Sequence, residues 1–118
     1  MKIAIATDNN KCSEHFGRCE EFKVYEIENK KIINEESIIN PEHKFNFLPK
    51  YLKEKEIDVI ISTDMGRNAQ NNFSKYDIEV ITGVTGSIDE IIRLYLKGEL
   101  KSNNKICTRQ VFKKENEN

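Results

Sequence analysis

The chain has 118 residues, 33% of them charged, and a formal net charge of -1 at pH 7. A chain of this length is typical of one domain that folds around a single core without metal or disulfide support. Because charges of both signs are interleaved, nucleic acid and anionic membranes are not predicted partners. The apolar runs are too short for a signal peptide or a membrane span, which predicts a cytoplasmic protein. Three cysteines, an odd number, favour thiols or metal ligands over disulfides.

The first third of the chain predicts strands separated by a long loop. Residues 2–7 alternate and end in a polar cluster, which predicts a first strand. Residues 9–21 lack hydrophobic periodicity, and a loop of this length in a small domain is usually functional or mobile. Two further strands, 22–27 and 31–39, flank a turn at residues 29–30 and predict an antiparallel hairpin. Their apolar residues do not alternate cleanly, so a bulge or burial on two faces is expected.

The next part of the chain alternates between helical and extended patterns. It predicts a short helix at 50–55, a strand at 57–61, a helix at 67–76, a strand at 78–81 and a helix at 88–97. The strand at 57–61 is a nearly continuous β-branched run, which indicates a central position in the sheet. The last helix has the clearest signals, a capping box at Ser87 and Glu90 and a C-terminal stop at Gly98.

These elements predict an α/β domain at residues 1–100 followed by a polar tail. The sheet is expected to be mixed and five-stranded, with three antiparallel-connected strands, then parallel βαβ units, and helices on both faces. The tail, residues 101–118, is predicted to hold at most a short strand at Ile106 or Val111.

The carboxyl ends of the first, fourth and fifth strands are expected to meet at one rim of the sheet, where open α/β folds bind ligands. The rim would be made of residues 8–19, 63–66 and 83–87. Within it, Gly66 permits close approach of a ligand to the backbone. Met65 offers a soft thioether, although a methionine at a strand end is more often a packing residue.

The predicted loop carries two thiols and an imidazole, at Cys12, His15 and Cys19. Such side chains bind zinc and iron–sulfur clusters, although this spacing matches no standard motif. The alternative is that all three are simply exposed loop residues. A structural zinc site would need a fourth ligand, for which Cys107 is the remaining thiol.

The residues between the imidazole and the second thiol suggest separate roles. Phe16 is expected to anchor the loop to the core, and Gly17 to supply a backbone angle that other residues reach poorly. Arg18 would either pair with a nearby carboxylate or offset the negative charge of a sulfide cluster or an organic acid.

Several sequence motifs resemble those of one protein family in their order and spacing. They are Lys2-Ile-Ala-Ile-Ala-Thr-Asp8, His15-Phe-Gly-Arg18 with Phe22, Ile57-Asp-Val-Ile-Ile61 leading to Met65-Gly66 and Ala69, and the stretch from Ile78 to Gly86 with Tyr95-Leu-Lys-Gly-Glu-Leu100. Together they make residues 1–100 resemble the dinitrogenase iron–molybdenum cofactor biosynthesis family. The resemblance implies a ribonuclease H-like sheet, a link to nitrogen fixation, and the binding, carrying or storing of an iron–sulfur cluster or cofactor precursor without catalytic turnover.

The chain also departs from that family. Where many relatives look like Gly-Gly-Met/Ile-Gly-Pro, it has Thr63-Asp-Met-Gly-Arg67, which adds a carboxylate and removes a helix-starting proline. Cys19 stands where relatives usually carry a small residue, and Cys12 lies in a variable part of the loop. The roles of both thiols therefore rest on their chemistry alone.

We accordingly predict a non-catalytic binding or carrier protein for an iron–sulfur cluster, an iron–molybdenum-type cofactor or its precursor. Its partners would be proteins that deliver or receive that cofactor, and a homodimer through a sheet edge is left open. The predicted site residues are metal ligands at Cys12, His15 and Cys19, a charge-balancing Arg18, and an opposite wall at Met65 and Gly66.

Two other functions remain open at this point. Asp8 and Asp64 follow strands whose ends are expected to converge, and paired carboxylates there could hold Mg²⁺ for a nuclease of the ribonuclease H-like fold. Aspartate is also common at strand ends as a turn or capping residue, and a shared fold does not imply a shared function. The third reading is a regulatory interaction domain that binds no metal.

Overall fold

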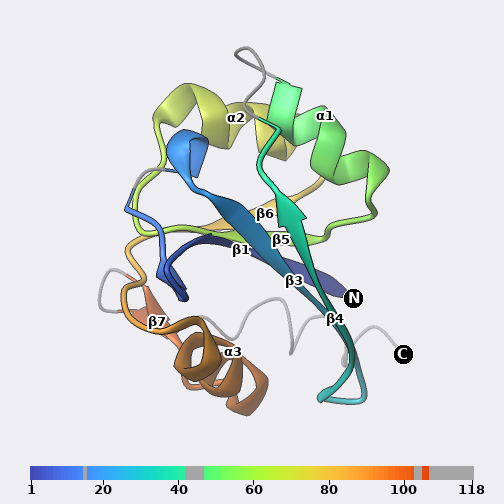
Figure 1. Cartoon of the computed structure of the whole chain (residues 1–118), viewed down its shortest axis with the longest axis vertical. Helices are drawn as coiled ribbons and strands as arrows, with labels where there is room; N and C mark the ends of the chain where they lie inside the picture. The colour runs from blue at the N-terminus through green and yellow to red at the C-terminus, as the bar shows by residue number, and fades with distance from the viewer. Residues whose placement is uncertain (15, 42–46, 103–104, 107–118) are drawn as a thin grey trace.

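A computed structural model describes residues 1–14, 16–41, 47–102 and 105–106 (Figure 1). The elements are β1 (Lys2–Asp8), β2 (Lys11–Cys12), the 3-10 helix η1 (Phe16–Arg18), β3 (Glu21–Glu28), β4 (Lys31–Ile39), α1 (Phe47–Glu54), β5 (Val59–Ile61), α2 (Arg67–Lys75), β6 (Glu79–Ile81), α3 (Ile88–Lys97), β7 (Lys101–Ser102) and β8 (Lys105–Ile106).

The main sheet is mixed, as predicted, with the strand order β4-β3-β1-β5-β6. Strands β1, β5 and β6 are parallel, whereas β3 runs antiparallel to both β1 and β4. The sheet has six strands rather than the predicted five, because Lys11 and Cys12 fold back and pair with Asp8 and Thr7. The segment predicted as a plain loop therefore contains a short strand and, further on, the turn of η1.

Helices cover both faces of the sheet, as expected (Figure 1). Successive residues of a strand point to opposite faces, so Ile3 and Ile5 of β1 join one core while Ala4 and Ala6 join the other. The first core includes residues of α3, and the second includes residues of α1 and α2; we call them the α3-side core and the α2-side core. Strand β1 is fully buried from Ile3 to Ala6, which explains its central place.

The predicted hairpin joins β3 to β4. Asn29 and Lys30 form its turn with φ of 54° and 63°, the left-handed conformation that two-residue hairpins favour. The expected bulge is present, because the register between the two strands shifts between Glu26 and Ile27. Strand β4 stands at the end of the strand order and so forms one edge of the main sheet.

The second half of the chain follows its local signals closely. The Ser87 hydroxyl accepts a hydrogen bond from the Glu90 amide at 3.3 Å, and Gly98 ends α3 with a φ of 71°. Where at most one short strand was predicted beyond residue 100, the structure has two, β7 and β8; the expected position Ile106 lies in β8 and pairs with Lys101 of β7. Val111 lies outside the described residues. Among the described residues, no helix has both the length and the apolar character needed to cross a membrane.

Candidate functional site

The three segments of the predicted rim form one hydrogen-bonded unit. The Thr63 amide donates to the Ser13 carbonyl at 3.0 Å, and the Gly83 amide donates to the Thr63 carbonyl at 2.8 Å. On the other side, the Cys12 amide donates to the Gly86 carbonyl at 2.9 Å. The parallel pairing of β1, β5 and β6 brings their carboxyl ends to one edge, and these bonds close that edge.

Asp8 fastens the long loop at both of its ends. One carboxylate oxygen accepts a hydrogen bond from the Ser13 hydroxyl at 2.6 Å, and the other accepts one from the Glu20 amide at 2.7 Å. The Glu20 carboxylate in turn accepts a hydrogen bond from the Asn9 amide at 3.1 Å. Asp8 therefore has a structural role, in line with the turn or capping alternative for a strand-end aspartate. Its two partners could not be predicted, because both lie on a segment without a regular pattern.

The same observations bear on the nuclease alternative. Asp64 is exposed, and its carbonyl oxygen accepts hydrogen bonds from the Phe16 amide and the Ser62 hydroxyl. Within the described part of the chain, no three His, Cys, Asp or Glu side chains are grouped to hold a metal ion. The described residues thus add no support for a magnesium site at Asp8 and Asp64.

The turn of η1 anchors the loop to the α2-side core. Phe16 is buried, and its ring lies 5.8 Å from that of Phe22 and 5.2 Å from that of Phe73, as the anchoring prediction requires. The expectation for Gly17 is wrong, because its φ is not positive and a Cβ atom there would meet no described atom within 4 Å. Arg18, the next residue, is exposed to solvent.

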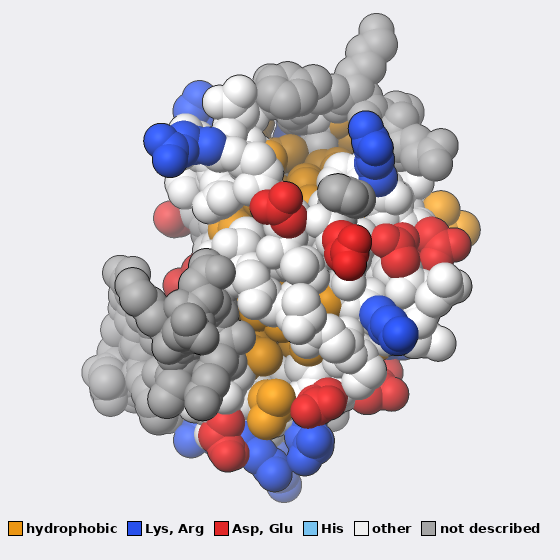
Figure 2. All heavy atoms as spheres, turned by 90° about the vertical axis from the view of Figure 1, so that its left-hand side faces the viewer, with side chains coloured by type: hydrophobic (Ala, Val, Ile, Leu, Met, Phe, Trp, Pro, Cys, Tyr) orange, Lys and Arg blue, Asp and Glu red, His pale blue; other side chains and the backbone are white. Residues whose placement is uncertain are grey.

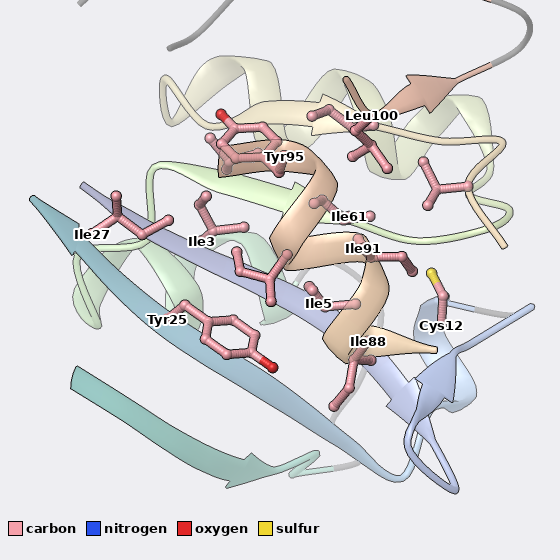
Figure 3. Close-up of a cluster of buried hydrophobic side chains, with 14 residues drawn as sticks. Ile3, Ile5, Cys12, Tyr25, Ile27, Ile61, Ile88, Ile91, Tyr95 and Leu100 are labelled. Atoms are coloured by element: carbon pink, nitrogen blue, oxygen red, sulfur yellow. The ribbon is translucent and has the colours of Figure 1, made fainter. Parts of the chain in front are cut away.

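The two thiols of the loop lie in different cores. Cys12 belongs to the α3-side core, where it lies near Ile88 and Ile91 (Figure 3), whereas Cys19 belongs to the α2-side core together with Met65. Both are buried, so the alternative of exposed loop residues is wrong for the two cysteines. His15, the third predicted ligand, lies outside the described residues, and so does Cys107.

Burial also affects the acidity of the thiols. It raises the pKa of Cys12 above its ordinary 9.0, against an opposing hydrogen bond with Thr63. Burial likewise raises the pKa of Cys19 to about 12, and the nearby Asp8 charge adds to the shift. Both thiols are therefore protonated at neutral pH. Because thiolates are the metal-binding form, ligation would require loss of the proton and exposure of the sulfur.

The start of α2 is open. Among the described residues no side chain caps it at Gly66, which has a φ of -62°, and its first turn carries no acidic residue. A Cβ atom on Gly66 would meet no described atom within 4 Å, so the fold itself does not demand glycine there. Arg67 is exposed at the first helical position. We call Phe16–Arg18 with residues 65–67 the α2 end of the rim.

At the other two glycines of the rim, the backbone conformation itself favours glycine. Gly83 and Gly86 have φ of 80° and 110°, values that other residues rarely adopt. They shape the turn before α3, and we call residues 83–90 with 11–12 the α3 end of the rim. Figure 2 faces the side of the molecule that holds the rim, where acidic and basic side chains are intermixed and hydrophobic atoms show only between them.

A family model for the dinitrogenase iron–molybdenum cofactor matches residues 1–98. The chain belongs to the dinitrogenase iron–molybdenum cofactor family. Protein MJ0580 of Methanocaldococcus jannaschii is 39% identical over 106 residues, which cover 86% of this chain and 90% of the relative. The matched range spans the whole rim of this family member.

Solved structures support the same placement in the family. The crystal structure of PH0822 is 30% identical with a TM-score of 0.82, and the alignment covers 87% of this chain and 95% of that one. The crystal structure of MJ0327 from Methanocaldococcus jannaschii is 27% identical with a TM-score of 0.72, covering 89% of this chain and 96% of the other. The overall fold is therefore similar across these proteins.

Proposed function

We propose that this protein binds and carries an iron–sulfur cluster, an iron–molybdenum-type cofactor or its precursor, without converting it. Membership of the family supports a role in making such a cofactor. The observation that carries the proposal is the open α2 end, where Gly66 leaves space beside an uncapped helix N-terminus. The cargo would bind there.

The chemistry of the α2 end suits an anionic cargo. Sulfide clusters and organic acid groups carry negative charge, which the positive end of a helix dipole and unpaired backbone N–H groups stabilise. Arg67 adds a positive charge at the first helical position, and Arg18 is exposed on the adjoining η1. Without a side chain at Gly66, the cargo can approach the backbone closely.

Ligation of the cargo by sulfur would follow its docking at the α2 end. In the proposal, Cys12, His15 and Cys19 act as soft ligands only after the loop opens, because both thiols are buried and protonated. Cys19 is the nearer candidate, since it shares the α2-side core with Met65. Opening is compatible with a carrier, because a cargo held in a rigid closed site would be released too slowly.

The proposal also covers the location of the protein, its partners and its fold classification. The protein would act in the cytoplasm and exchange its cargo with proteins that deliver or receive it. The strand order, with the antiparallel pair β3 and β4 on one side of β1 and the parallel strands β5 and β6 on the other, is compatible with a ribonuclease H-like classification.

The first experiment tests the charges at the α2 end. The protein is reconstituted anaerobically with ferrous iron and sulfide, and bound cluster is measured by visible absorption and by iron and sulfide content. We expect the wild type to bind cluster and the double variant Arg18→Glu/Arg67→Glu to retain about tenfold less. Lys53→Glu/Lys75→Glu makes the same change in charge at exposed positions in the last turns of α1 and α2, so it is the matched control and should bind like the wild type.

The second arm tests the sulfur and imidazole ligands. The variants Cys12→Ser/Cys19→Ser and His15→Ala should release cluster faster than the wild type, because they keep the docking charges but lack soft ligands. If the wild type takes up no cluster while a proven cluster carrier does so in parallel, loading with an iron–sulfur cluster is ruled out. If the arginine variant binds normally, the α2 end is not the docking site.

A further inference from the structure

A second surface lies on the α3 side of the sheet, between α3 and the hairpin. It is a groove of about 430 Å³. Tyr25, Ile32 and Glu35 line it from the hairpin, and Asp89, Ile92 and Leu96 line it from α3. The carboxylates of Glu35 and Asp89 belong to this groove, as do the apolar side chains, so it offers both charge and hydrophobic contact.

The groove contains the buried hydroxyl of Tyr25. Tyr25 is 2% exposed, and among the described residues its hydroxyl has no hydrogen-bond partner. Figure 3 shows its ring between β3 and α3. Burial, with the charges of Asp89 and Glu35, raises the pKa of Tyr25 to about 12, so the phenol is neutral. A neutral phenol can both donate and accept a hydrogen bond, and an incoming polar group would satisfy it.

The strand beside the groove presents an open edge. Within the described part of the chain, β4 pairs only with β3, so one edge of its nine residues offers unpaired backbone groups. Three large hydrophobic side chains of β4 are exposed, Ile32 at 37%, Ile33 at 53% and Ile39 at 78%. A long edge strand with exposed hydrophobic residues is a template for the addition of another strand.

The charges on β4 disfavour a second copy of this chain as that strand. Glu35 and Glu36 are exposed at the centre of the strand, between its two isoleucine pairs. Any antiparallel register that pairs Ile32 or Ile33 with Ile38 or Ile39 of another copy also sets Glu35 or Glu36 opposite a glutamate. Like charges directly opposite each other are destabilising in a sheet. A strand with basic residues would instead complement this edge.

We propose that β4 binds an extended segment of a partner protein in which an apolar and a basic residue stand two positions apart. The segment extends the sheet through backbone hydrogen bonds. Because every second side chain of a strand points to the same face, two of its side chains enter the groove. The apolar one lies beside Ile32 and Leu96. The Lys or Arg lies between Glu35 and Asp89 and donates a hydrogen bond to the Tyr25 hydroxyl.

Other charges around the groove set the orientation of the segment. The Lys23 ammonium lies 3.5 Å from the Glu35 carboxylate in an ion pair, so the incoming cation shares that carboxylate, whereas Asp89 has no ion pair among the described residues. Arg93 and Lys97 also line the groove. Since Lys97 follows Leu96, the apolar side chain belongs at that end and the basic one at the end where Asp89 lies.

The test is a titration of the intact, ¹⁵N-labelled protein with the blocked peptide Thr-Ser-Val-Thr-Lys-Thr-Ser, followed by amide chemical shifts. We expect shifts along Lys31–Ile39 and a dissociation constant of about 1 mM. The same peptide with Glu in place of Lys should bind at least about tenfold more weakly, and so should the Lys peptide to Glu35→Gln/Asp89→Asn.

Tyr25→Phe separates binding from packing. It keeps the buried ring and removes only the unpartnered hydroxyl, so the free protein should be at least as stable as the wild type. Peptide binding should nevertheless weaken several-fold, which a purely structural tyrosine would not cause. Unchanged binding by Tyr25→Phe would remove the hydroxyl from the proposed contact.

Several results would overturn the proposal. One is a titration that leaves the β4 amides unmoved or moves them equally with the Glu peptide. Another is a concentration-dependent shift of the β4 amides without peptide, which would assign this edge to a second copy. A third is a set of nuclear Overhauser contacts between β4 and residues 107–118 in the peptide-free protein, which would assign it to the chain's own C-terminal segment. None of these outcomes depends on cofactor binding at the rim.

Discussion

Helices α2 and α3 both begin at the same rim, yet their first turns differ in almost every respect. The first turn of α3 is completed by its own side chains, with the Ser87 hydroxyl as cap and Asp89 and Glu90 as favourable acidic residues. Helix α2 begins at Gly66 without a side-chain cap among the described residues, and Arg67 places a cation where a helix dipole favours an anion.

In the proposed function, the start of α3 serves folding and the start of α2 serves binding. At the α3 end, the Ser87 cap and the Asn10 carbonyl, which accepts a hydrogen bond from the Ile88 amide at 3.1 Å, pair backbone N–H groups without a ligand. The α2 end has no side-chain cap among the described residues and has space beside Gly66, which costs some helix stability but suits an anionic ligand. In this family member, the proposed binding half of the rim is therefore the one whose helix lacks a cap among the described residues.

The largest expected effect comes from the residue that holds the loop against α2. Phe16→Ala removes a buried ring that packs against Phe22 and Phe73, and we expect the free energy of unfolding to fall by about 3 kcal/mol. Urea unfolding followed by circular dichroism measures this. A loss below about 1 kcal/mol would mean that the loop is held by its hydrogen bonds rather than by Phe16.

Much of the fold follows from signals that lie within a few residues of each other. The turn at Asn29 and Lys30 and the caps of α3 at Ser87 and Gly98 are local, and each was predicted from the sequence. The convergence of the three rim segments also follows from the predicted parallel strands. Local patterns and the rules of sheet topology are enough for these features.

The details of the loop could not be predicted, because they depend on distant partners. Cys12 and Cys19 stand among polar neighbours, yet the pairing of β2 with β1 takes the first into the α3-side core. Cys19 is held by Asn40, whose amide donates to its carbonyl at 2.9 Å from 21 residues away. No sequence-local signal marks such contacts, so the burial that separates the two thiols became visible only in three dimensions.

The second prediction compares the two halves of the rim through their thiols. Because burial raises the pKa of Cys19 from 9.0 to about 12, the folded state holds that proton more tightly than the unfolded state. Stability from this group is complete below pH 9 and is lost as the pH rises from 9 towards 12. The expected loss approaches about 1.4 kcal/mol per pH unit in that window.

Urea unfolding at pH 8, 9 and 10 measures the slope for the wild type and for Cys19→Ala and Cys12→Ala. Each variant should lose stability less steeply than the wild type above pH 9, and Cys12→Ala is the matched variant on the α3 side, where the pKa is also raised. Tyr25 contributes to the slope in all three proteins and cancels in the comparison. Equal slopes would show that the thiols are already exposed to solvent.

The smallest effects give the sharpest test of the two helix starts. Ser87→Ala removes the cap of α3 and should lower the free energy of unfolding by about 1 kcal/mol, with cargo retention unchanged. Gly66→Ser adds a cap to α2 where the new side chain has room, and should raise stability by a few tenths of a kcal/mol. Both changes are measured by urea unfolding and by anaerobic cluster reconstitution.

The two substitutions should therefore uncouple stability from binding. Ser87→Ala should lower stability and leave cluster retention unchanged, whereas Gly66→Ser should raise stability and lower retention. Ser at position 66 would place a side chain in the space proposed for the cargo and hydrogen-bond the N–H groups that the cargo would use, so a more stable protein should retain less cluster. If Gly66→Ser retained as much cluster as the wild type, the empty space at the start of α2 would have no role in binding. If Ser87→Ala lost cluster instead, the binding half of the rim would be the α3 end, and the contrast between the two helices would have to be explained by folding alone.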